Sequence, residues 1–242
     1  MASIRTLHPL KGERDFTWRG GNPTRVEALT DMVFAFALTL LVVSNAPPST
    51  FAELTGLLWG FPGFAAAFAI LLLIWHSHYM FFRRYALEDG WTTTLNAALL
   101  FIILFFVYPL KYLATMLSAF IVGLVAGNPS APLSFEEARS ALAIMSTGYA
   151  LVFVMFAALY AHALSKADQL ELNTRELQLT RFGLWAQLVH VGVGAAVVFA
   201  ALVLPLQFSP FAGFLYFFIG PLMFLVGVVV APDPKPAPRP GM

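Results

Sequence analysis

The stretch Arg25-Val-Glu-Ala-Leu-Thr-Asp-Met-Val-Phe-Ala-Phe-Ala-Leu-Thr-Leu-Leu-Val-Val43 decides the fold, because it carries Asp31 into an otherwise apolar run. Only 15 charge-free residues separate Asp31 from the helix-stopping pair Pro47-Pro48. They make about 22 Å of helix, which is short of a hydrocarbon core of about 30 Å. A membrane helix here must therefore begin before Met32 and include Asp31. Because an unpaired buried carboxylate is costly, Asp31 is expected to have a partner.

The composition excludes an ordinary soluble globular protein. Of the 242 residues, 59% are hydrophobic and 11% charged, and the mean hydropathy is +0.77. Charge-free windows predict an all-α, polytopic membrane protein with six transmembrane helices. The predicted helices cover residues 24–46, 57–82, 92–122, 137–164, 180–206 and 210–231. The absence of cysteine excludes disulfides and thiolate metal sites.

The distribution of Lys and Arg predicts the orientation. Alternate segments between the predicted helices carry 12 basic residues on one side and 2 on the other. The positive-inside rule then places both termini in the cytoplasm, which an even number of spans requires. We expect a cytoplasmic tail over residues 1–23, a six-helix domain over 24–231 and a Pro-rich cytoplasmic tail over 232–242. Both tails are expected to be disordered or extended.

Three polar residues on successive predicted helices fall at one depth, about two turns from the cytoplasmic face. Asp31 follows Arg25 by six residues, His78 precedes Arg83 by five, and Asn96 lies near the start of the third helix. A carboxylate, an imidazole and an amide at one level can form a hydrogen-bonded cluster. We favour a role in tying the first three helices together over direct contact with a substrate.

An apolar stripe lies on a different face of the first helix. Phe36, Leu40 and Val43 follow i, i+4, i+7 spacing, and Asp31 is about 140° around the helix from Phe36. From spacing alone, ordinary packing or lipid contact is the simpler interpretation of the stripe. Thr39 is expected to hydrogen-bond to its own helix, although a hydroxyl beside an apolar ring can also meet a permeating ion.

A series of motifs in the first 110 residues or so resembles the transmembrane protein 175 family, the endolysosomal potassium channel and its prokaryotic relatives. Arg25-x-x-x-Leu29-Thr30-Asp31 is similar to the R-x-x-x-F-S-D signature of that family. The similarity continues through Val33-Phe34-Ala35-x-Ala37-x-Thr39-Leu40-Leu41-Val42, Trp75-x-x-His78-x-x-x-Phe82, and Leu95-Asn96 followed by Pro109. The remaining chain matches by the number and polarity of its spans.

The resemblance implies a potassium-permeable channel in a prokaryotic cell membrane, assembled as a homotetramer around a pore that the first helices line. It assigns pore constriction and selectivity to Phe36, Thr39, Leu40 and Val43. It assigns a structural motif and helix-anchoring network to Arg25, Leu29, Thr30, Asp31, Trp75, His78 and Asn96. Family members carry Ile or Leu where this chain has Phe36, and four Phe rings at one level would narrow the pore and favour its dewetting.

Two other membrane functions remain open on the sequence. His78, His162 and His190 fall in or near the cytoplasmic half, so a bis-histidine haem protein is one alternative. A proton-coupled transporter that uses Asp31 as its proton site is the other. We expect no enzyme activity, because no nucleophile and base share a depth and no phosphate loop or metal-ligand spacing is present. We expect potassium ions, membrane lipids and other copies of the chain as partners, and no cofactor or nucleic acid.

Overall fold

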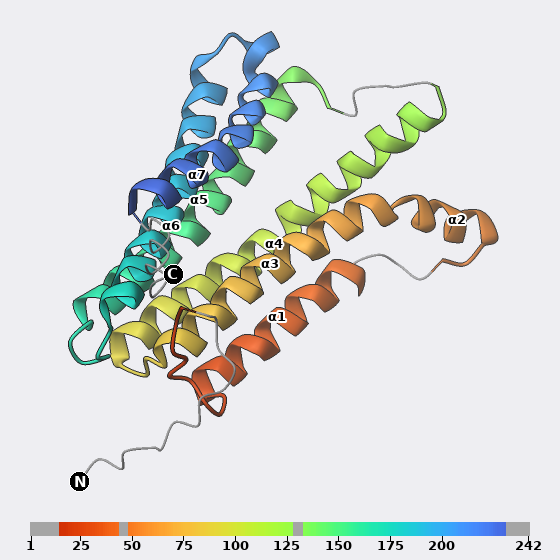
Figure 1. Cartoon of the computed structure of the whole chain (residues 1–242). Coiled ribbons are helices and arrows are strands. Elements are labelled where there is room, and N and C mark those ends of the chain that lie inside the picture. The colour runs from red at the N-terminus through yellow and green to blue at the C-terminus, as the bar shows by residue number, and fades with distance from the viewer. Residues whose placement is uncertain (1–14, 44–47, 128–132, 231–242) are drawn as a thin grey trace, which may run out of the picture.

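The computed structural model describes residues 15–43, 48–127 and 133–230, and all regular structure in these ranges is helical (Figure 1). The elements in chain order are α1 (Arg25–Val43), α2 (Phe51–Trp59), α3 (Phe61–Tyr85), α4 (Gly90–Val125), α5 (Phe135–Ser165), α6 (Thr174–Val203), the 3-10 helix η1 (Leu206–Phe218) and α7 (Ile219–Val230). The prediction of an all-α, multi-pass membrane protein is confirmed. The predicted tail over 232–242 lies outside the described residues.

Five helical segments are long and apolar enough to cross a membrane: α3, α4, α5, α6 and the joined segment Leu206–Val230. They coincide with five of the six predicted spans. α1 is not among them, because its 19 residues include Arg25, Glu27 and Asp31. That α1 also spans the membrane stays a prediction.

Two of the predicted boundaries are wrong. A single helix from residue 57 was expected, but α2 ends at Trp59 and α3 starts at Phe61, with Pro62 in its first turn. Proline there has no N–H to donate to the preceding turn, so it begins a helix more readily than it continues one. The last predicted helix is also divided, since residues 206–218 form the 3-10 helix η1 before α7 begins.

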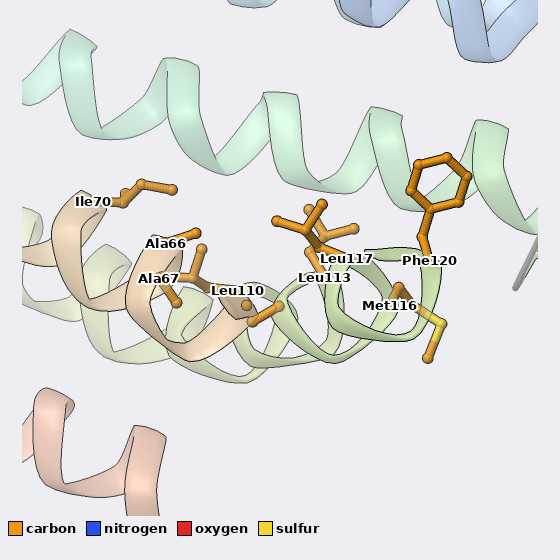
Figure 2. Close-up of a pocket in the computed structure, with 10 residues that line it drawn as sticks. Ala66, Ala67, Ile70, Leu110, Leu113, Met116, Leu117 and Phe120 are labelled. Carbon is orange, nitrogen blue, oxygen red and sulfur yellow. The ribbon is translucent and has the colours of Figure 1, made fainter. Parts of the chain in front are cut away.

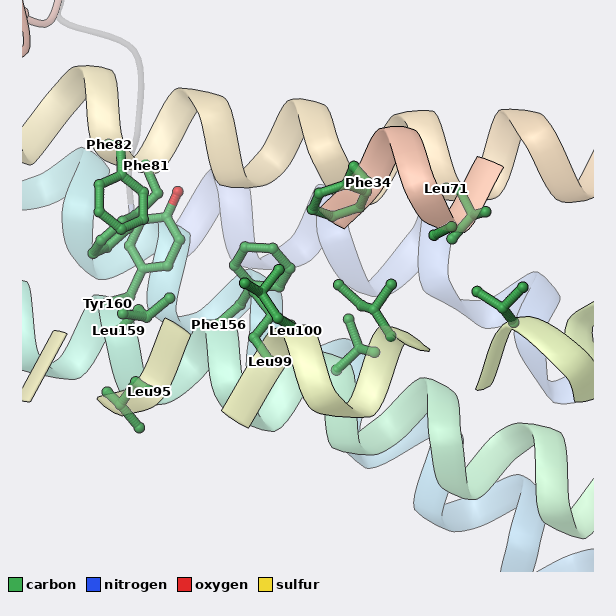
Figure 3. Packing of buried hydrophobic residues seen from close by; sticks show 14 of the residues in the cluster. Phe34, Leu71, Phe81, Phe82, Leu95, Leu99, Leu100, Phe156, Leu159 and Tyr160 are labelled. Atoms are coloured by element: carbon green, nitrogen blue, oxygen red, sulfur yellow. The ribbon is translucent and has the colours of Figure 1, made fainter. Parts of the chain in front are cut away.

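The helices form two groups. α1 packs on α3 and α4, while α5 packs on α6 and η1, and α7 packs on α6 and η1. In Figure 1, α4 and α5 lie together where α4 begins and α5 ends, and they diverge toward the opposite end. One buried apolar cluster joins α1, α3, α4 and α5, and Figure 3 draws some of its side chains, including Phe34, Leu99 and Phe156. α1 therefore packs on α3 and α4, and these two helices are in turn in contact with α5.

The predicted N-terminal tail is anchored from Asp15 onward. Residues 15–23 contain no helix, but Phe16 is only 3% exposed and its ring meets the Tyr85 ring edge-on at 5.5 Å. The backbone N–H groups of Arg19 and Gly20 both donate to the Arg83 carbonyl at 3.0 Å. This segment is thus part of the fold, whereas the prediction for residues 1–14 lies outside the described residues.

A helix cap fixes the turn between α3 and α4. The Asp89 carboxylate accepts from the Thr92 N–H at 2.8 Å and lies 2.7 Å from His162 Nε2 at the end of α5. Burial raises the pKa of Asp89, but the hydrogen bonds from Thr92 and His162 outweigh it and hold this pKa at about 2. The cap therefore stays charged at neutral pH, where it stabilises the start of α4.

At the opposite end α3 and α4 approach closely. A Cβ at Gly63 would lie 1.7 Å from the Ala114 carbonyl oxygen, so only glycine permits this contact. The Ser118 hydroxyl accepts from the Gly63 N–H at 2.8 Å and donates to the Gly60 carbonyl at 3.0 Å. Ser118 therefore satisfies an N–H in the first turn of α3 that the helix itself leaves free.

Ser118→Ala is expected to lower the free energy of unfolding by about 1–3 kcal/mol, because it leaves a buried N–H without an acceptor. Chemical or thermal unfolding in detergent would measure the change. Thr115→Ala is the matched control: its exposed hydroxyl donates only to the Lys111 carbonyl of its own helix, at 3.1 Å. Equal effects of the two substitutions would refute a special role for Ser118.

Beyond this contact, α3 and α4 line an apolar pocket of about 430 Å³, shown in Figure 2. Its lining includes Ile70 on α3 and Phe120 on α4, and every described lining residue is apolar. A small-molecule site needs polar groups that fix the orientation of its ligand. This pocket therefore offers no chemistry, and the polar residues of α1 and its neighbours are the better candidate site.

Candidate functional site: the first helix and its anchoring residues

α1 has two distinct faces. Its buried residues are Glu27, Thr30, Phe34, Ala37 and Leu41, spaced alternately by three and four. This spacing confines them to a sector roughly 80° wide. Met32 lies opposite Leu41 and is 63% exposed, and Leu29 and Phe36 beside it are 52% and 55% exposed. Within the described residues, nothing covers this outer face.

The predicted pore residues do not all lie on the outer face of α1. Phe36 and Thr39 are exposed on the outer face, and the Thr39 hydroxyl donates to the Ala35 carbonyl at 2.8 Å. Leu40 is half-buried against the core that α1 shares with α3 and α4. Val43 is the last residue of α1, and its side chain lies outside the described part. Leu40 therefore contributes to packing within the chain, which agrees with the simpler interpretation of the stripe.

A buried chain of hydrogen bonds links α1, α4 and α3. His78 Nε2 lies 2.8 Å from Asn96 Oδ1, and Asn96 Nδ2 donates to the Thr30 hydroxyl at 2.9 Å. The Thr30 hydroxyl in turn donates to the Val26 carbonyl at 2.9 Å. Because the amide oxygen of Asn96 can only accept, His78 must carry its proton on Nε2. We call His78, Asn96 and Thr30 the polar relay; each is at most 2% exposed.

Asp31 lies beside the polar relay instead of within it. Its Oδ1 accepts from Trp75 Nε1 at 2.8 Å, and the residue is exposed at the flank of α1. Consecutive helical residues point about 100° apart, so only one of Thr30 and Asp31 can face the gap between α3 and α4. Thr30 takes that position. The expected hydrogen-bonded cluster is therefore wrong for Asp31, whereas His78 and Asn96 do meet as expected.

The remaining motif residues lie on the exposed side. Leu29 is on the outer face, and Arg25 is exposed at the first position of α1. Arg25 is about 120° around the helix from Asp31, and the part of the chain that the structure describes gives its side chain no hydrogen-bond partner. The anchoring roles of Arg25 and Leu29 stay predictions.

Two features of α1 escaped the sequence analysis. Glu27 and Thr24 form a capping pair: the Glu27 N–H donates to the Thr24 hydroxyl at 3.2 Å, and the Thr24 N–H donates to the Glu27 carboxylate at 2.6 Å. The Thr-x-x-Glu signature would have revealed it. The second feature is Met32, which is exposed on the outer face of α1. It precedes Phe36 by four residues, and this spacing was the signal that the two side chains share a face.

The three histidines considered for haem already have other partners. His78 and His162 use Nε2 in bonds of 2.8 and 2.7 Å, to Asn96 and Asp89 respectively. His190 Nδ1 donates to the Ala186 carbonyl at 2.7 Å, and its ring stacks on Phe153 at 4.3 Å. Coordination of haem iron through the first two would require these bonds to break. The geometry therefore gives the haem alternative no support.

Comparisons with known proteins agree with the motif series. Residues 25–106 match the family described as the endosomal/lysosomal potassium channel TMEM175. A potassium channel from Marivirga tractuosa is 35% identical over 226 residues, which cover 90% of this chain and 91% of that protein. A potassium channel from Chamaesiphon minutus is 29% identical over 174 residues, 66% of this chain and 77% of that protein.

The similarity extends to three-dimensional structure. The crystallised potassium channel MtTMEM175, a threonine-to-alanine variant in complex with a nanobody–MBP fusion, superimposes with a TM-score of 0.81 at 32% identity. The match covers 91% of this chain and 98% of that one. It thus includes the helices after residue 110, where no motif was recognised. This chain belongs to the TMEM175 family.

Proposed function

We propose that this chain is the subunit of a potassium-permeable channel, in which four copies surround a pore lined by the outer face of α1. The exposed outer face carries the proposal: Leu29, Met32 and Phe36 are each more than half exposed, whereas the opposite face of α1 is buried against α3 and α4. Potassium channels among the relatives support potassium as the permeant ion. The family is one of channels, and we propose no catalytic activity.

In a symmetric assembly, the outer faces of α1 from all copies would face one another. In a cyclic oligomer, every copy presents the same surface to the symmetry axis, so one exposed helix face per chain is enough to line a pore. Phe36 would then form a ring at one level, and Thr39 would add a ring of hydroxyls one turn further along. An apolar ring of this kind restricts ion passage because it excludes water when it is narrow.

The inner face of α1 would set the position of that ring. The polar relay and the Asp31–Trp75 bond hold α1 at fixed rotation against α3 and α4. Asp31 is about 140° from Phe36, which places its carboxylate away from the proposed pore axis. We therefore propose that Asp31 orients α1, and we give it no role as a proton carrier. The proposal places the protein in a prokaryotic cell membrane, surrounded by lipid, with both termini cytoplasmic.

Purified protein in liposomes is expected to conduct potassium faster than sodium. The rates at which potassium leaves potassium-loaded vesicles and sodium leaves sodium-loaded vesicles, measured with the same preparation, test which ion permeates. Native mass determination in detergent is expected to give four chains. Equal leak of the two ions would contradict the selectivity, no flux in well-folded protein would contradict the channel, and any other mass would contradict the tetramer.

A further inference from the structure

We propose that the ion pair between Arg19 and Glu176 positions α1 for gating, by tying the segment that precedes α1 to the start of α6. This inference rests on the proposed channel function. It concerns residues 15–23, which we call the N-terminal strap. Neither residue of the pair lies in α1 or in the polar relay.

Arg19 gathers several acceptors from the α5–α6 turn. Its Nη2 lies 2.9 Å from Glu176 Oε2, and its Nη1 lies 3.3 Å from Oε1. Its Nε donates to the Leu170 carbonyl at 2.7 Å, and Nη2 also donates to the Glu171 carbonyl at 3.3 Å. A planar guanidinium can satisfy such a set at once, whereas an ammonium cannot. The contact therefore depends on arginine and not only on positive charge.

Glu176 holds the strap and the start of α6 together. Its side chain is 1% exposed, and Oε1 accepts from the Thr17 N–H at 2.8 Å. Oε2 accepts from the Asn173 N–H at 3.1 Å, which completes the capping box of α6. A buried carboxylate that loses its cation is strongly destabilised. Separation of the strap from α6 is thus opposed by the whole group of bonds.

The strap leads from this anchor to α1 along the end of α3. The backbone N–H groups of Arg19 and Gly20 both donate to the Arg83 carbonyl at the end of α3. A Cβ at Gly20 would lie 2.9 Å from the Phe82 carbonyl oxygen, so the backbone passes closer to α3 than other residues allow. Only four residues separate Gly20 from Arg25, the first residue of α1. Movement of the cytoplasmic end of α1 must therefore stretch or release the strap.

This arrangement makes the strap a restraint on the pore helix. Among the described elements, α1 packs only on α3 and α4, along its inner face. The strap adds a connection to α6, which α1 does not otherwise contact appreciably. Widening a ring of Phe36 side chains requires α1 to tilt or rotate. Release of the Arg19–Glu176 pair should make that movement easier and raise the fraction of open channels.

The test compares Arg19→Gln, Glu176→Gln, the double variant and wild type as full-length protein in liposomes. Glu137→Gln is the matched control, because Glu137 fills the same capping-box position on α5 but contacts only Ser134. Glutamine keeps a capping side chain in both helices. Potassium flux per folded protein and amide exchange in residues 25–31 are the two measurements.

Both single variants are expected to raise flux and α1 exchange roughly fivefold or more, and the double variant should match them, because each removes the same contact. Glu137→Gln should resemble wild type. If Arg19→Gln is too unstable to fold, Arg19→Lys replaces it, because it keeps the positive charge. Arg19→Lys is expected to raise flux and α1 exchange less than Arg19→Gln does. α1 exchange within twofold of the control, or additive effects in the double variant, would overturn the proposal. Wild-type protein without flux would refute the channel, while the exchange measurement would still decide the role of the strap.

Discussion

Phe36→Ala is expected to raise the potassium flux of reconstituted channels roughly tenfold or more, which corresponds to a barrier lowered by about 1.4 kcal/mol or more. Four phenylalanine rings at one level of a pore would exclude water, and methyl groups in their place would leave a wider, wetted passage. Phe36 is 55% exposed in the single chain, so the substitution removes little of the chain's own core. The measurement is the initial rate of potassium flux in liposomes, normalised to folded protein.

Phe101→Ala provides the matched control for this experiment. Phe101 is 71% exposed on α4, a helix that the proposal places behind α1 and away from the pore. The same loss of a ring there should leave flux within about twofold of wild type, a barrier change of less than about 0.5 kcal/mol. Unchanged flux in a well-folded Phe36→Ala variant that assembles like wild type would rule out Phe36 as the constriction.

Asn96→Leu is expected to lower the free energy of unfolding by about 2–4 kcal/mol. Asn96 is the central member of the polar relay, and its loss removes the acceptor for His78 Nε2–H and the donor to Thr30. The His78 N–H left without an acceptor costs about 1–3 kcal/mol, and the lost bond to Thr30, whose hydroxyl still donates to Val26, adds about 0.5–1.5 kcal/mol. Thermal and chemical unfolding in detergent, followed by circular dichroism, would measure the change.

Two further variants separate this effect from general damage to α4. Thr94→Ala is the control, since the exposed Thr94 hydroxyl donates only to the Gly90 carbonyl of its own helix, at 2.8 Å. Adding His78→Phe to Asn96→Leu should recover part of the stability, because both polar partners are then gone. A loss below about 0.5 kcal/mol for Asn96→Leu, typical of surface substitutions, would refute the importance of the relay.

Hydropathy and fixed helix geometry made much of the fold predictable. In a membrane, long charge-free segments have few alternatives to helix, so five spans follow from the sequence alone. The rise per residue is also fixed, which is why counting from the predicted helix ends brought His78 and Asn96 to one level. The break at Gly60 and the 3-10 conformation of residues 206–218 were missed, because short turns and 3-10 segments leave no hydropathy signal.

The rotation of α1 was only partly predictable. The sequence separates Phe36 from Asp31 by angle, but it does not say which side meets α3 and α4. Thr30 and Asp31 are neighbours, and both need a hydrogen-bond partner. In the structure Thr30 accepts from Asn96, and Asp31 accepts from Trp75. That choice depends on how α1 docks against two other helices.

The sequence by itself determined a helical membrane protein of this family, the shared level of His78 and Asn96 and the two-sided character of α1. Only the tertiary structure decided that Thr30 joins the relay, that Leu40 is partly packed, and that the N-terminal strap is anchored. The Arg19–Glu176 pair joins residues 157 positions apart. Neither residue has a periodic or hydrophobic pattern that marks it, so their meeting depends on how the helices pack together.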